Sequence, residues 1–229
     1  MKRVVVLTGA GISAESGIST FRDSNGLWRN HRIEEVASPV AWERNPELVL
    51  EFYNLRRKQL FEVEPNEGHK ALARLQKGYD VHIVTQNVDD LHERAGSKNV
   101  LHLHGELKKA RSTVDPSLIY TLDSWELKLG DKCEKGSQLR PHIVWFGEAV
   151  PMIEPAAKLC ASADIFMVIG TSMVVYPAAG LIHYVAQHTP KYYLDPKAYK
   201  VQGVDNLTVI KGKAGEKLPA LVDRLLFEA

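Results

Sequence analysis

The sequence predicts an α/β fold built on a mainly parallel sheet. Patterns of strand and helix alternate along most of the 229 residues, as in chains made of βαβ units. The strand patterns are short, apolar and rich in β-branched residues, which indicates strands buried on both faces. With 45% hydrophobic and 25% charged residues, the chain has the composition needed to bury a core.

Five apolar runs are the predicted strands, namely residues 4–7, 81–84, 100–103, 165–169 and 207–210. Helical patterns lie near them, at residues 12–16, 69–76, 155–161, 178–187 and 216–227. No internal repeat or Gly/Ser linker interrupts this order. We therefore expect a single domain over residues 1–229 that carries an insert.

Two stretches break the alternation. Residues 27–63 are rich in helix formers and aromatic residues and show no strand pattern, and residues 106–139 are polar, irregular and charged. We expect both to form a small second module, against a large part made of residues 1–26, 64–105 and 140–229. A cleft between the two would suit a ligand, because ligands favour such clefts and the carboxyl ends of parallel strands.

The charge balance excludes several classes of partner. With 29 Lys and Arg against 28 Asp and Glu, the net charge is +1, so we expect neither nucleic acid nor a membrane as a partner. The two cysteines, Cys133 and Cys160, argue against a disulfide-built secreted domain. No apolar run reaches signal-peptide or bilayer length, and we expect a cytoplasmic protein.

A glycine-rich turn follows the first predicted strand. Residues 9–14, GAGISA, match the G-x-G-x-x-G/A pattern and open a predicted helix. Such glycines let the backbone approach a pyrophosphate, although an ordinary tight strand-to-helix turn is the alternative. In a dehydrogenase an acidic residue about 20 positions later ends a second strand. Here Glu34 and Glu35 lie in a stretch without a strand pattern, which argues against an ordinary dehydrogenase.

Five sequence blocks then occur in a fixed order along the chain. They are GAGISAESGI with TFR in residues 9–22, TQNVD at 85–89, HG at 104–105, WFGE at 145–148 and GTS at 170–172. Together they resemble the sirtuins, the NAD-dependent protein deacylases. The resemblance implies a Rossmann-type, doubly wound parallel sheet with a small inserted module, and NAD as the co-substrate.

The resemblance also implies which residues bind NAD. The glycine turn would cradle the pyrophosphate, and residues 20–22 would form a mobile loop in which Phe21 shields the reacting face. Asp195 would bind the adenosine ribose, although the asparagine expected two positions earlier is Tyr193. The full set is Gly9, Ala10, Gly11, Ile12, Glu15, Thr20, Phe21, Arg22, Trp28, Gln86, Asn87, Asp89, Gly170, Thr171, Ser172, Asp195 and Ala214.

Sirtuin chemistry requires a base for a ribose hydroxyl. His102 and His104 alternate along one predicted strand and should face the same side, and a neutral imidazole accepts a proton near pH 7. The sirtuin base is the histidine directly before a glycine, here His104, so His102 is left as a core or supporting residue. The resemblance makes Asn87 the second catalytic residue, which orients the ribose and nicotinamide together with Asp89. The alternative is that Asn87 and Asp89 cap the following helix.

The acylated peptide is expected to bind as an extended strand between residues 144–148 and 173–176. Two exposed edges can pair with the substrate backbone, so recognition would be largely main-chain. The predicted contacts are Val144, Phe146, Gly147, Glu148 and Val175.

An amphipathic helix is predicted over residues 46–62. Within it Tyr53 and Arg56 share a face, and an arginine turned inward requires an anionic partner. A structural salt bridge, or an arginine whose charged end reaches solvent, is the alternative. The Tyr-x-x-Arg pair resembles the sirtuin subgroup that removes succinyl, malonyl and similar acidic acyl groups. We therefore expect Tyr53 and Arg56 to bind an acyl carboxylate and desuccinylation to exceed deacetylation.

The chain departs from most sirtuins, which carry two cysteine pairs that bind a structural zinc ion. Residues 106–139 contain only Cys133, and a tetrahedral site needs four ligands. We therefore predict no structural zinc. The module would instead be held by apolar packing of Leu118, Ile119, Tyr120, Leu122, Trp125, Leu127 and Leu129.

The sequence thus predicts an NAD-dependent protein-lysine deacylase, active as desuccinylase, demalonylase and deacetylase. It would transfer the acyl group to ADP-ribose and release nicotinamide, and its partners would be acylated lysine side chains of proteins. Two alternatives stay open: a mono-ADP-ribosyltransferase and a non-catalytic NAD-binding sensor. The oligomeric state is not predicted by any motif, and a monomer is the simplest expectation.

Overall fold

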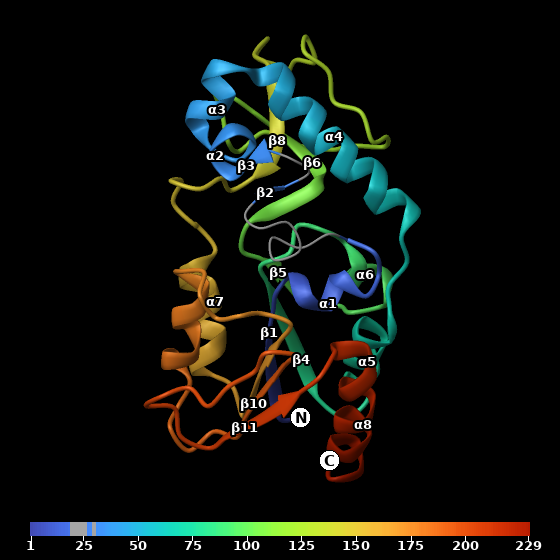
Figure 1. The fold of residues 1–229 in the computed structure, drawn as a ribbon, viewed down its shortest axis with the longest axis vertical. Helices are drawn as coiled ribbons and strands as arrows, with labels where there is room; N and C mark the ends of the chain where they lie inside the picture. Colours follow the sequence, from blue (N-terminus) through green and yellow to red (C-terminus); the bar gives the residue numbers. More distant parts are fainter. Residues whose placement is uncertain (19–26, 29–30) are drawn as a thin grey trace.

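The computed structural model describes residues 1–18 and 31–229, and the backbone of residues 27–28 (Figure 1). Its centre is a parallel sheet whose strands, in order, are β11 (Leu207–Lys211), β10 (Lys191–Asp195), β9 (Ile165–Ile169), β1 (Arg3–Thr8), β4 (Asp80–Thr85) and β5 (Val100–His102). Counted along the chain from the β5 edge, this is the order 3-2-1-4-5-6 of a Rossmann sheet. The expected α/β fold class is confirmed.

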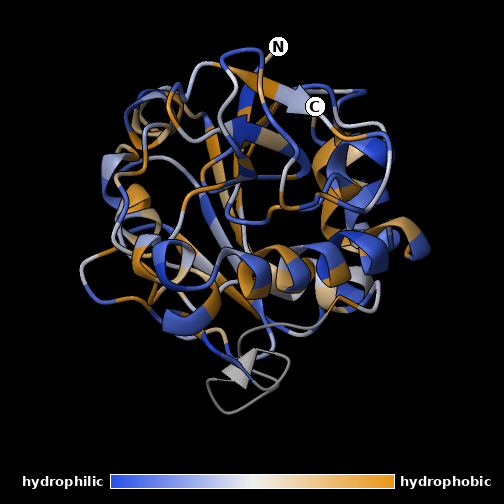
Figure 2. Cartoon of the chain, turned by 90° about the horizontal axis from the view of Figure 1, so that it is seen from above, coloured by the Kyte–Doolittle hydropathy of each residue, from blue (hydrophilic) through white to orange (hydrophobic). Residues whose placement is uncertain are grey.

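The central strand β1 shows why the sheet is apolar. Residues 4–8 are completely buried, because helices cover both faces. Val4 and Val6 face one core cluster, and Val5 and Leu7 face the other, as the two-residue period of a strand requires. The helices carry both colours in Figure 2, hydrophobic and hydrophilic, as amphipathic helices do.

Helices lie on both sides of the sheet (Figure 1). The first core cluster packs β1 against α5 (Glu67–Leu75) and α8 (Ala214–Phe227). The second packs it against α7 (Ile153–Ala161) and η1 (Ala178–Tyr184). The helix expected over 178–187 is thus a shorter 3₁₀ helix, in which Ala178, Leu181 and Ile182 are buried. Two short helices, α1 (Ala10–Ala14) and α6 (Leu91–Arg94), directly follow the carboxyl ends of β1 and β4.

A second group of elements lies at the upper end of Figure 1. It contains a two-stranded ribbon, β2 (Leu27–Trp28) and β3 (His31–Arg32), and the helices α2 (Ile33–Val36), α3 (Pro39–Arg44) and α4 (Pro46–Glu62). It also contains an antiparallel sheet in the order β7 (Ile119–Thr121), β6 (Gly105–Ser112), β8 (Leu139–Ile143). We propose that these elements form the expected small module, whose exact boundaries stay a prediction.

Two expectations about this module need correction. Residues 27–63 do contain strand residues, in the short ribbon. Residues 106–139 contribute β6 and β7 to an antiparallel sheet, although the rest of this stretch is largely irregular, as expected. The pairing of β6 with β8 shifts register between Gly105 and Ala110. Such an irregularity interrupts the apolar–polar alternation that marks a strand in sequence.

The expected apolar packing is only partly correct. Leu127 is buried in a cluster with Leu50, Ala110, Cys133 and Leu139, and Leu118, Tyr120 and Leu122 pack against it. By contrast, the side chains of Ile119, Trp125 and Leu129 are 46%, 37% and 53% exposed. Among the described residues, no helix combines the length and apolar character needed to cross a bilayer.

Candidate active site

The loops that follow β1 and β9 pack directly against each other. The N–H of Gly9 donates to Ile169 O at 3.0 Å, and that of Gly11 donates to Gly170 O at 2.8 Å. A Cβ on Gly9 would lie 2.6 Å from Thr171 Cβ, and one on Gly11 would lie 2.7 Å from Gly170 O. Both glycines are therefore required by this loop contact. The contact uses the N–H groups of both glycines, and the pyrophosphate cradle expected from Gly9, Ala10 and Gly11 stays a prediction.

This contact marks the place where the strand order of the sheet reverses, between β1 and β9. In Rossmann sheets, the ligand crevice lies at the carboxyl ends of the strands on either side of this point. The predicted cofactor residues of the glycine turn, of residues 86–89 and of residues 170–172 all follow these strand ends. The fold thus brings three separate sequence blocks to one edge of the sheet.

Asn87 follows β4 and is bonded to the glycine turn. Its Nδ2 donates to Gly9 O at 3.1 Å and to Ser13 Oγ at 3.0 Å. Both amide hydrogens are therefore used, and Oδ1 is the atom that remains to accept a hydrogen bond from a ligand. The expectation that Asn87 acts only as a helix cap does not fit these contacts.

Asp89 lies nearby and is 5% exposed. Its Oδ1 accepts the N–H of Leu91 at 3.2 Å, so this carboxylate does cap the first turn of α6, as the alternative interpretation predicted. Burial raises its pKa above the usual value for aspartate. Gln86 Nε2 donates to Thr171 Oγ1 at 3.3 Å and links the loops after β4 and β9.

The bonding of the two histidines distinguishes their roles. His104 Nδ1 lies 3.0 Å from Gln86 O. A carbonyl only accepts, so Nδ1 carries the hydrogen and Nε2 keeps a lone pair. Burial lowers the pKa of His104, and the ring is therefore neutral near pH 7. His104 has the protonation state that a general base requires.

His102 ends β5, whereas His104 lies beyond it, so the two do not share one strand as expected. Both ring nitrogens of His102 are used: Nδ1 lies 3.0 Å from Asn87 O and Nε2 lies 2.8 Å from Glu93 Oε1. Burial acts to lower the pKa of His102, but the hydrogen bond and charge of Glu93 outweigh it, and the pKa is raised. With both ring nitrogens bonded to acceptors, His102 has no nitrogen left to take a proton from a substrate and is a supporting residue.

The predicted peptide segment, residues 144–148, already has bonds of its own. The N–H groups of Val144 and Phe146 donate to His104 O and Ala37 O at 2.9 and 3.0 Å. Glu148 accepts from Trp145 N at 2.7 Å and pairs with Arg140 at 2.8 Å. This pairing lowers the pKa of Glu148 although burial opposes the shift.

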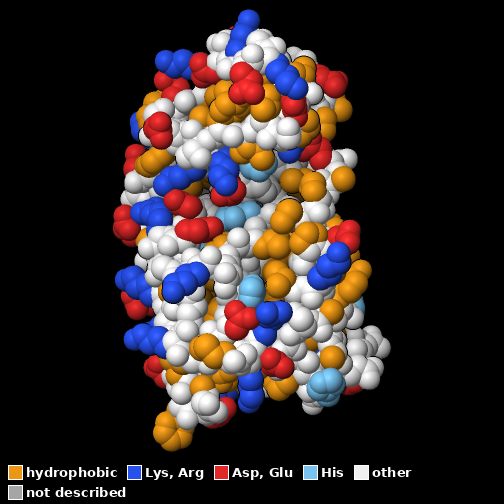
Figure 3. Space-filling model, turned by 180° about the vertical axis from the view of Figure 1, so that it is seen from behind, with side chains coloured by type: hydrophobic (Ala, Val, Ile, Leu, Met, Phe, Trp, Pro, Cys, Tyr) orange, Lys and Arg blue, Asp and Glu red, His pale blue; other side chains and the backbone are white. Residues whose placement is uncertain are grey.

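Two other side chains predicted to contact the peptide are partly exposed. The Phe146 side chain is 51% exposed and that of Val175 is 39% exposed, while Gly147 adopts a φ of +91°. Seen from behind in Figure 3, hydrophobic and histidine side chains lie at the surface near the middle of the long axis of the molecule. The structure therefore leaves side chains for substrate contact, and Glu148 is held by arginines instead.

The predicted acyl pocket lies on α4. The Tyr53 side chain is 1% exposed, and its hydroxyl accepts the indole N–H of Trp145 at 3.1 Å. The Arg56 guanidinium lies 6.0 Å from the Tyr53 ring centroid. The fully buried arginine of this helix is its neighbour Arg57, which donates to Trp125 O at 2.7 Å and Asn54 Oδ1 at 2.9 Å. Burial lowers the pKa of Arg57 to about 10.

The predicted adenosine end of the site is held by β10 and α8. Asp195 is fully buried and accepts the N–H of Lys197 at 2.8 Å. Tyr193, where the family pattern has asparagine, donates to Thr171 O at 3.0 Å and so supports the loop of residues 170–172. The Glu15 carboxylate accepts Gly215 N–H at 2.9 Å, beside Ala214 at the start of α8.

Several predicted residues contribute differently or are not described. The Ile12 side chain is fully buried in the core, so only its backbone can face a cofactor. Ala10 begins α1, and Ser172 is half-buried. Thr20, Phe21, Arg22 and the side chain of Trp28 lie outside the described residues.

No group of three or more His, Cys, Asp or Glu side chains in the described part of the chain is placed to hold a metal ion. Cys133 Sγ lies 3.3 Å from Ser112 Oγ and 3.2 Å from Ser137 Oγ. Cys160 is buried in the separate core cluster beside α7. The two cysteines therefore belong to different packing environments.

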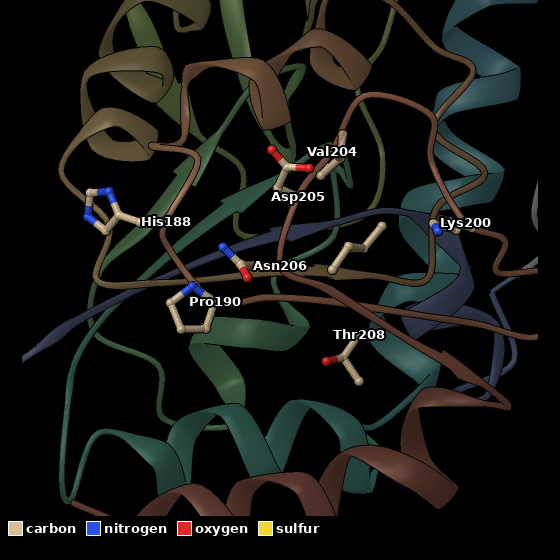
Figure 4. Close-up of a pocket in the computed structure, with 8 residues that line it drawn as sticks. His188, Pro190, Lys200, Val204, Asp205, Asn206 and Thr208 are labelled. Carbon is tan, nitrogen blue, oxygen red and sulfur yellow. The ribbon is translucent and has the colours of Figure 1, made fainter.

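Two cavities lie away from these strand ends. One of about 520 Å³ lies at the amino ends of β10 and β11, where Pro190, Asp205 and Asn206 line it (Figure 4). Another of about 380 Å³ lies between α4 and residues 125–129. None of the described site residues lines either one. The candidate site is therefore identified by the polar side chains and glycines that follow β1, β4 and β9, and not by a cavity.

Comparison with known proteins agrees with this placement. The model of the Sir2 family matches residues 9–177. A curated NAD-dependent protein deacylase of Helicobacter pylori is 54% identical over 226 residues, which cover 99% of this chain and 98% of the relative. A Sir2 homologue solved with ADP-ribose has a TM-score of 0.89 and 42% identity, over 99% of this chain and 92% of that one.

A Sir2 homologue solved with NAD gives a TM-score of 0.88 and 42% identity, over 99% of this chain and 90% of the other. The likeness thus covers sequence and fold over nearly the whole chain. Sequence reasoning did not predict three contacts of the site, those of Ser13 Oγ with Asn87, of Arg140 with Glu148 and of the Tyr193 hydroxyl with Thr171 O. Each joins residues of different elements or loops, so no local motif indicates it. A family match over most of the chain, with a full-length relative above 50% identity, establishes that this protein belongs to the Sir2 family, the sirtuins.

Proposed function

We propose that this sirtuin is an NAD-dependent protein-lysine deacylase that removes acidic acyl groups, such as succinyl and malonyl, in addition to acetyl. The broader prediction, that this chain is an NAD-dependent protein deacylase, is confirmed by the family match and by the curated relatives of the chain. The single observation that carries the chemistry is the neutral His104 ring, whose Nδ1 is bonded to Gln86 O. The cytoplasmic location stays a prediction.

NAD, when bound, supplies a breakable nicotinamide–ribose bond and an ADP-ribose acceptor for the acyl group. The residues present fit it, because buried Asn87 offers only its Oδ1 beside the glycine turn. In our proposal His104 Nε2 takes a proton from a sugar hydroxyl, and Asn87 Oδ1 accepts a hydrogen bond that orients the sugar. Gln86, Thr171 and Ser172 would contact the ribose, and the first turn of α1 would face the phosphates.

The acyl preference is argued from the Tyr53 hydroxyl. Trp145 Nε1 is a donor only, so the Tyr53 oxygen accepts this bond and must donate its own hydrogen elsewhere. Burial raises the pKa of Tyr53 to about 12, so the hydroxyl stays protonated. Arg56 adds a positive charge next to the same ring. A donor and a cation on one helix face suit a terminal carboxylate better than a methyl group.

The test compares two peptides that differ only in a succinyl or acetyl lysine. With NAD present, we expect nicotinamide release, loss of the acyl mass from the peptide and a larger kcat/KM for the succinyl peptide. Arg56→Met should lower that ratio about tenfold or more, because a charge-assisted pair is lost. Arg44→Met, which changes an exposed arginine at the end of α3, is the matched control. An unchanged ratio in Arg56→Met would overturn the proposed acyl preference.

The same assay decides between the alternative activities. A mono-ADP-ribosyltransferase would add the mass of ADP-ribose to a protein, and a sensor would bind NAD without releasing nicotinamide. We also propose that the protein folds without structural zinc, since Cys133 is bonded to two serines. Metal analysis of purified protein tests this, and zinc at one ion per chain would contradict it.

A further inference from the structure

A row of buried polar side chains lies beneath Asn87. Thr8 and Thr85 end the neighbouring strands β1 and β4 and are paired in register, and their hydroxyl oxygens are 2.8 Å apart. Thr85 Oγ1 accepts the backbone N–H of Asn87 at 3.0 Å. Thr8 Oγ1 lies 3.0 Å from His92 Nε2. Because both threonines and His92 are fully buried, solvent takes no part in these bonds.

His92 in turn contacts a second buried histidine. The rings of His69 and His92 meet edge to face with centroids 4.9 Å apart, and both residues are fully buried. Each ring has one nitrogen without a hydrogen-bond partner among the described residues, Nε2 of His69 and Nδ1 of His92. Leaving a buried polar atom unpaired costs about 1–3 kcal/mol. Two such atoms on adjoining rings therefore require an explanation.

The state of His69 follows from its other bond. Its Nδ1 accepts the backbone N–H of Asn66 at 3.3 Å, so a neutral ring must carry its hydrogen on Nε2. Burial lowers the pKa of His69 to about 4, which keeps the ring neutral near pH 7. The unpartnered nitrogen of His69 is therefore a donor.

We propose that His69 Nε2–H is directed at His92 Nδ1, directly or across one water, and that the resulting row of hydrogen bonds positions Asn87. In this row His92 carries its hydrogen on Nε2 and donates to Thr8, and Thr8 donates to Thr85. The opposite tautomer of His92 would turn an N–H of His92 toward the N–H of His69. Only the proposed tautomer matches a donor with an acceptor.

Both ends of the row are bonded to the loops of the candidate site. At one end, the Asn66 side chain donates to Ile12 O, within the glycine turn, at 2.7 Å and to Ser16 Oγ, just after it, at 2.9 Å. At the other end is the backbone of Asn87, whose side chain bonds to Gly9 O. His69, His92, Thr8 and Thr85 would thus set the position of Asn87 relative to the glycine turn.

These four are positioning residues, since none is placed to touch a ligand. The functional part of the inference rests on the proposed role of Asn87, whereas the tautomers can be measured without any substrate. A small misplacement of a group that orients the reacting sugar should lower kcat far more than it raises the KM for the peptide.

The first experiment measures the histidine tautomers by long-range ¹H–¹⁵N correlation NMR at pH 7. His69→Gln and His92→Gln variants assign the signals. We expect both rings to be neutral with the hydrogen on Nε2. A hydrogen on Nδ1 of His92, or a charged ring at either position, would overturn the row, whatever the enzyme's activity.

The second experiment removes one acceptor from the row. Thr85→Val deletes the hydroxyl that accepts from Asn87 N–H at nearly constant volume, and we expect kcat to fall about tenfold or more while the peptide KM changes less than about twofold. Thr85→Ser keeps the hydroxyl and should recover most of kcat. His82→Gln, which lies on the same strand and pairs with Asp80, is the control expected to keep wild-type kcat. A folded Thr85→Val enzyme with wild-type kcat would overturn the positioning role.

Discussion

The two parts of the molecule hold their functional side chains in different ways. At the edge of the six-stranded sheet, backbone carbonyls contribute directly: His104 is bonded to Gln86 O, and Asn87 to Gly9 O as well as to Ser13 Oγ. Around the predicted acyl pocket of the small module, side chains hold one another. Tyr53 accepts from Trp145, and the Arg140 guanidinium lies 3.3 Å from the centroid of the Trp145 ring.

This difference indicates a division of labour. Backbone contacts at strand ends are set by the sheet itself and tolerate little change, which suits chemistry that every acyl substrate shares. A network of side chains can change one residue at a time, which suits the choice of acyl group. Substitutions at the sheet edge should therefore affect all substrates equally, whereas substitutions in the module should change the ratio between substrates.

The largest effect is expected for His104→Gln. Removing a general base typically lowers rates by about 10²–10⁴-fold, and we expect losses in this range with succinyl and acetyl peptides alike. His102→Gln should lose far less, because both ring nitrogens of His102 are already bonded. Steady-state kinetics with both peptides measures this. Equal losses in the two variants would remove the distinction between the histidines.

The next effect concerns the stability of the small module. Arg57→Met removes the buried donor to the carbonyls of Leu107 and Trp125, and we expect a loss of about 3 kcal/mol in the free energy of unfolding. Urea unfolding followed by circular dichroism measures it. Lys58→Met, at an exposed neighbouring position, is the control and should change the stability little. If both variants unfold at the same urea concentration, the buried arginine does not stabilise the module.

Acid should destabilise the sheet-based part through its buried histidines. Because the folded pKa of His69 is about 4, the unfolded chain binds a proton there first as the pH falls below about 6.5. The associated loss of stability between pH 6.5 and 4 is about 3 kcal/mol. Burial also lowers the pKa of His92. Protonation of His92 in the unfolded chain therefore increases the loss of stability in acid. Urea unfolding at several pH values should show this slope in the wild type and a smaller one in His69→Gln.

The fold was predictable where the sequence carries one clear pattern. The buried residues 4–7 of β1 and the whole of β9 appear as unbroken apolar runs, and the glycine turn lies directly after β1. The sheet of the small module was not predictable, because the register shift in β6 interrupts its alternation. The five sequence blocks of the site were recognisable as motifs, but the hydrogen bonds between these blocks could not be predicted. The contact of Gly11 with Gly170, or of His92 with Thr8, joins residues more than eighty positions apart.

The smallest expected effect is also the most specific to the module. Trp145→Phe removes the indole donor to Tyr53 but keeps an aromatic ring beneath Arg140. We expect the succinyl-to-acetyl ratio of kcat/KM to fall about threefold to tenfold, the value of one hydrogen bond, with the acetyl reaction nearly unchanged. In a Tyr53→Phe background, Trp145→Phe should produce no further change, because its effect acts through the Tyr53 hydroxyl. Additive effects would mean that the two side chains act independently.

The pH dependence of kcat/KM with saturating NAD tests the role of His104 most directly. Since burial lowers the pKa of this ring, activity should persist below pH 6.5 and then decline on an acid limb that reports its protonation. That limb should disappear from the residual activity of His104→Gln. An acid limb centred above pH 6.5, or one that is unchanged in His104→Gln, would contradict the assignment of His104 as the base.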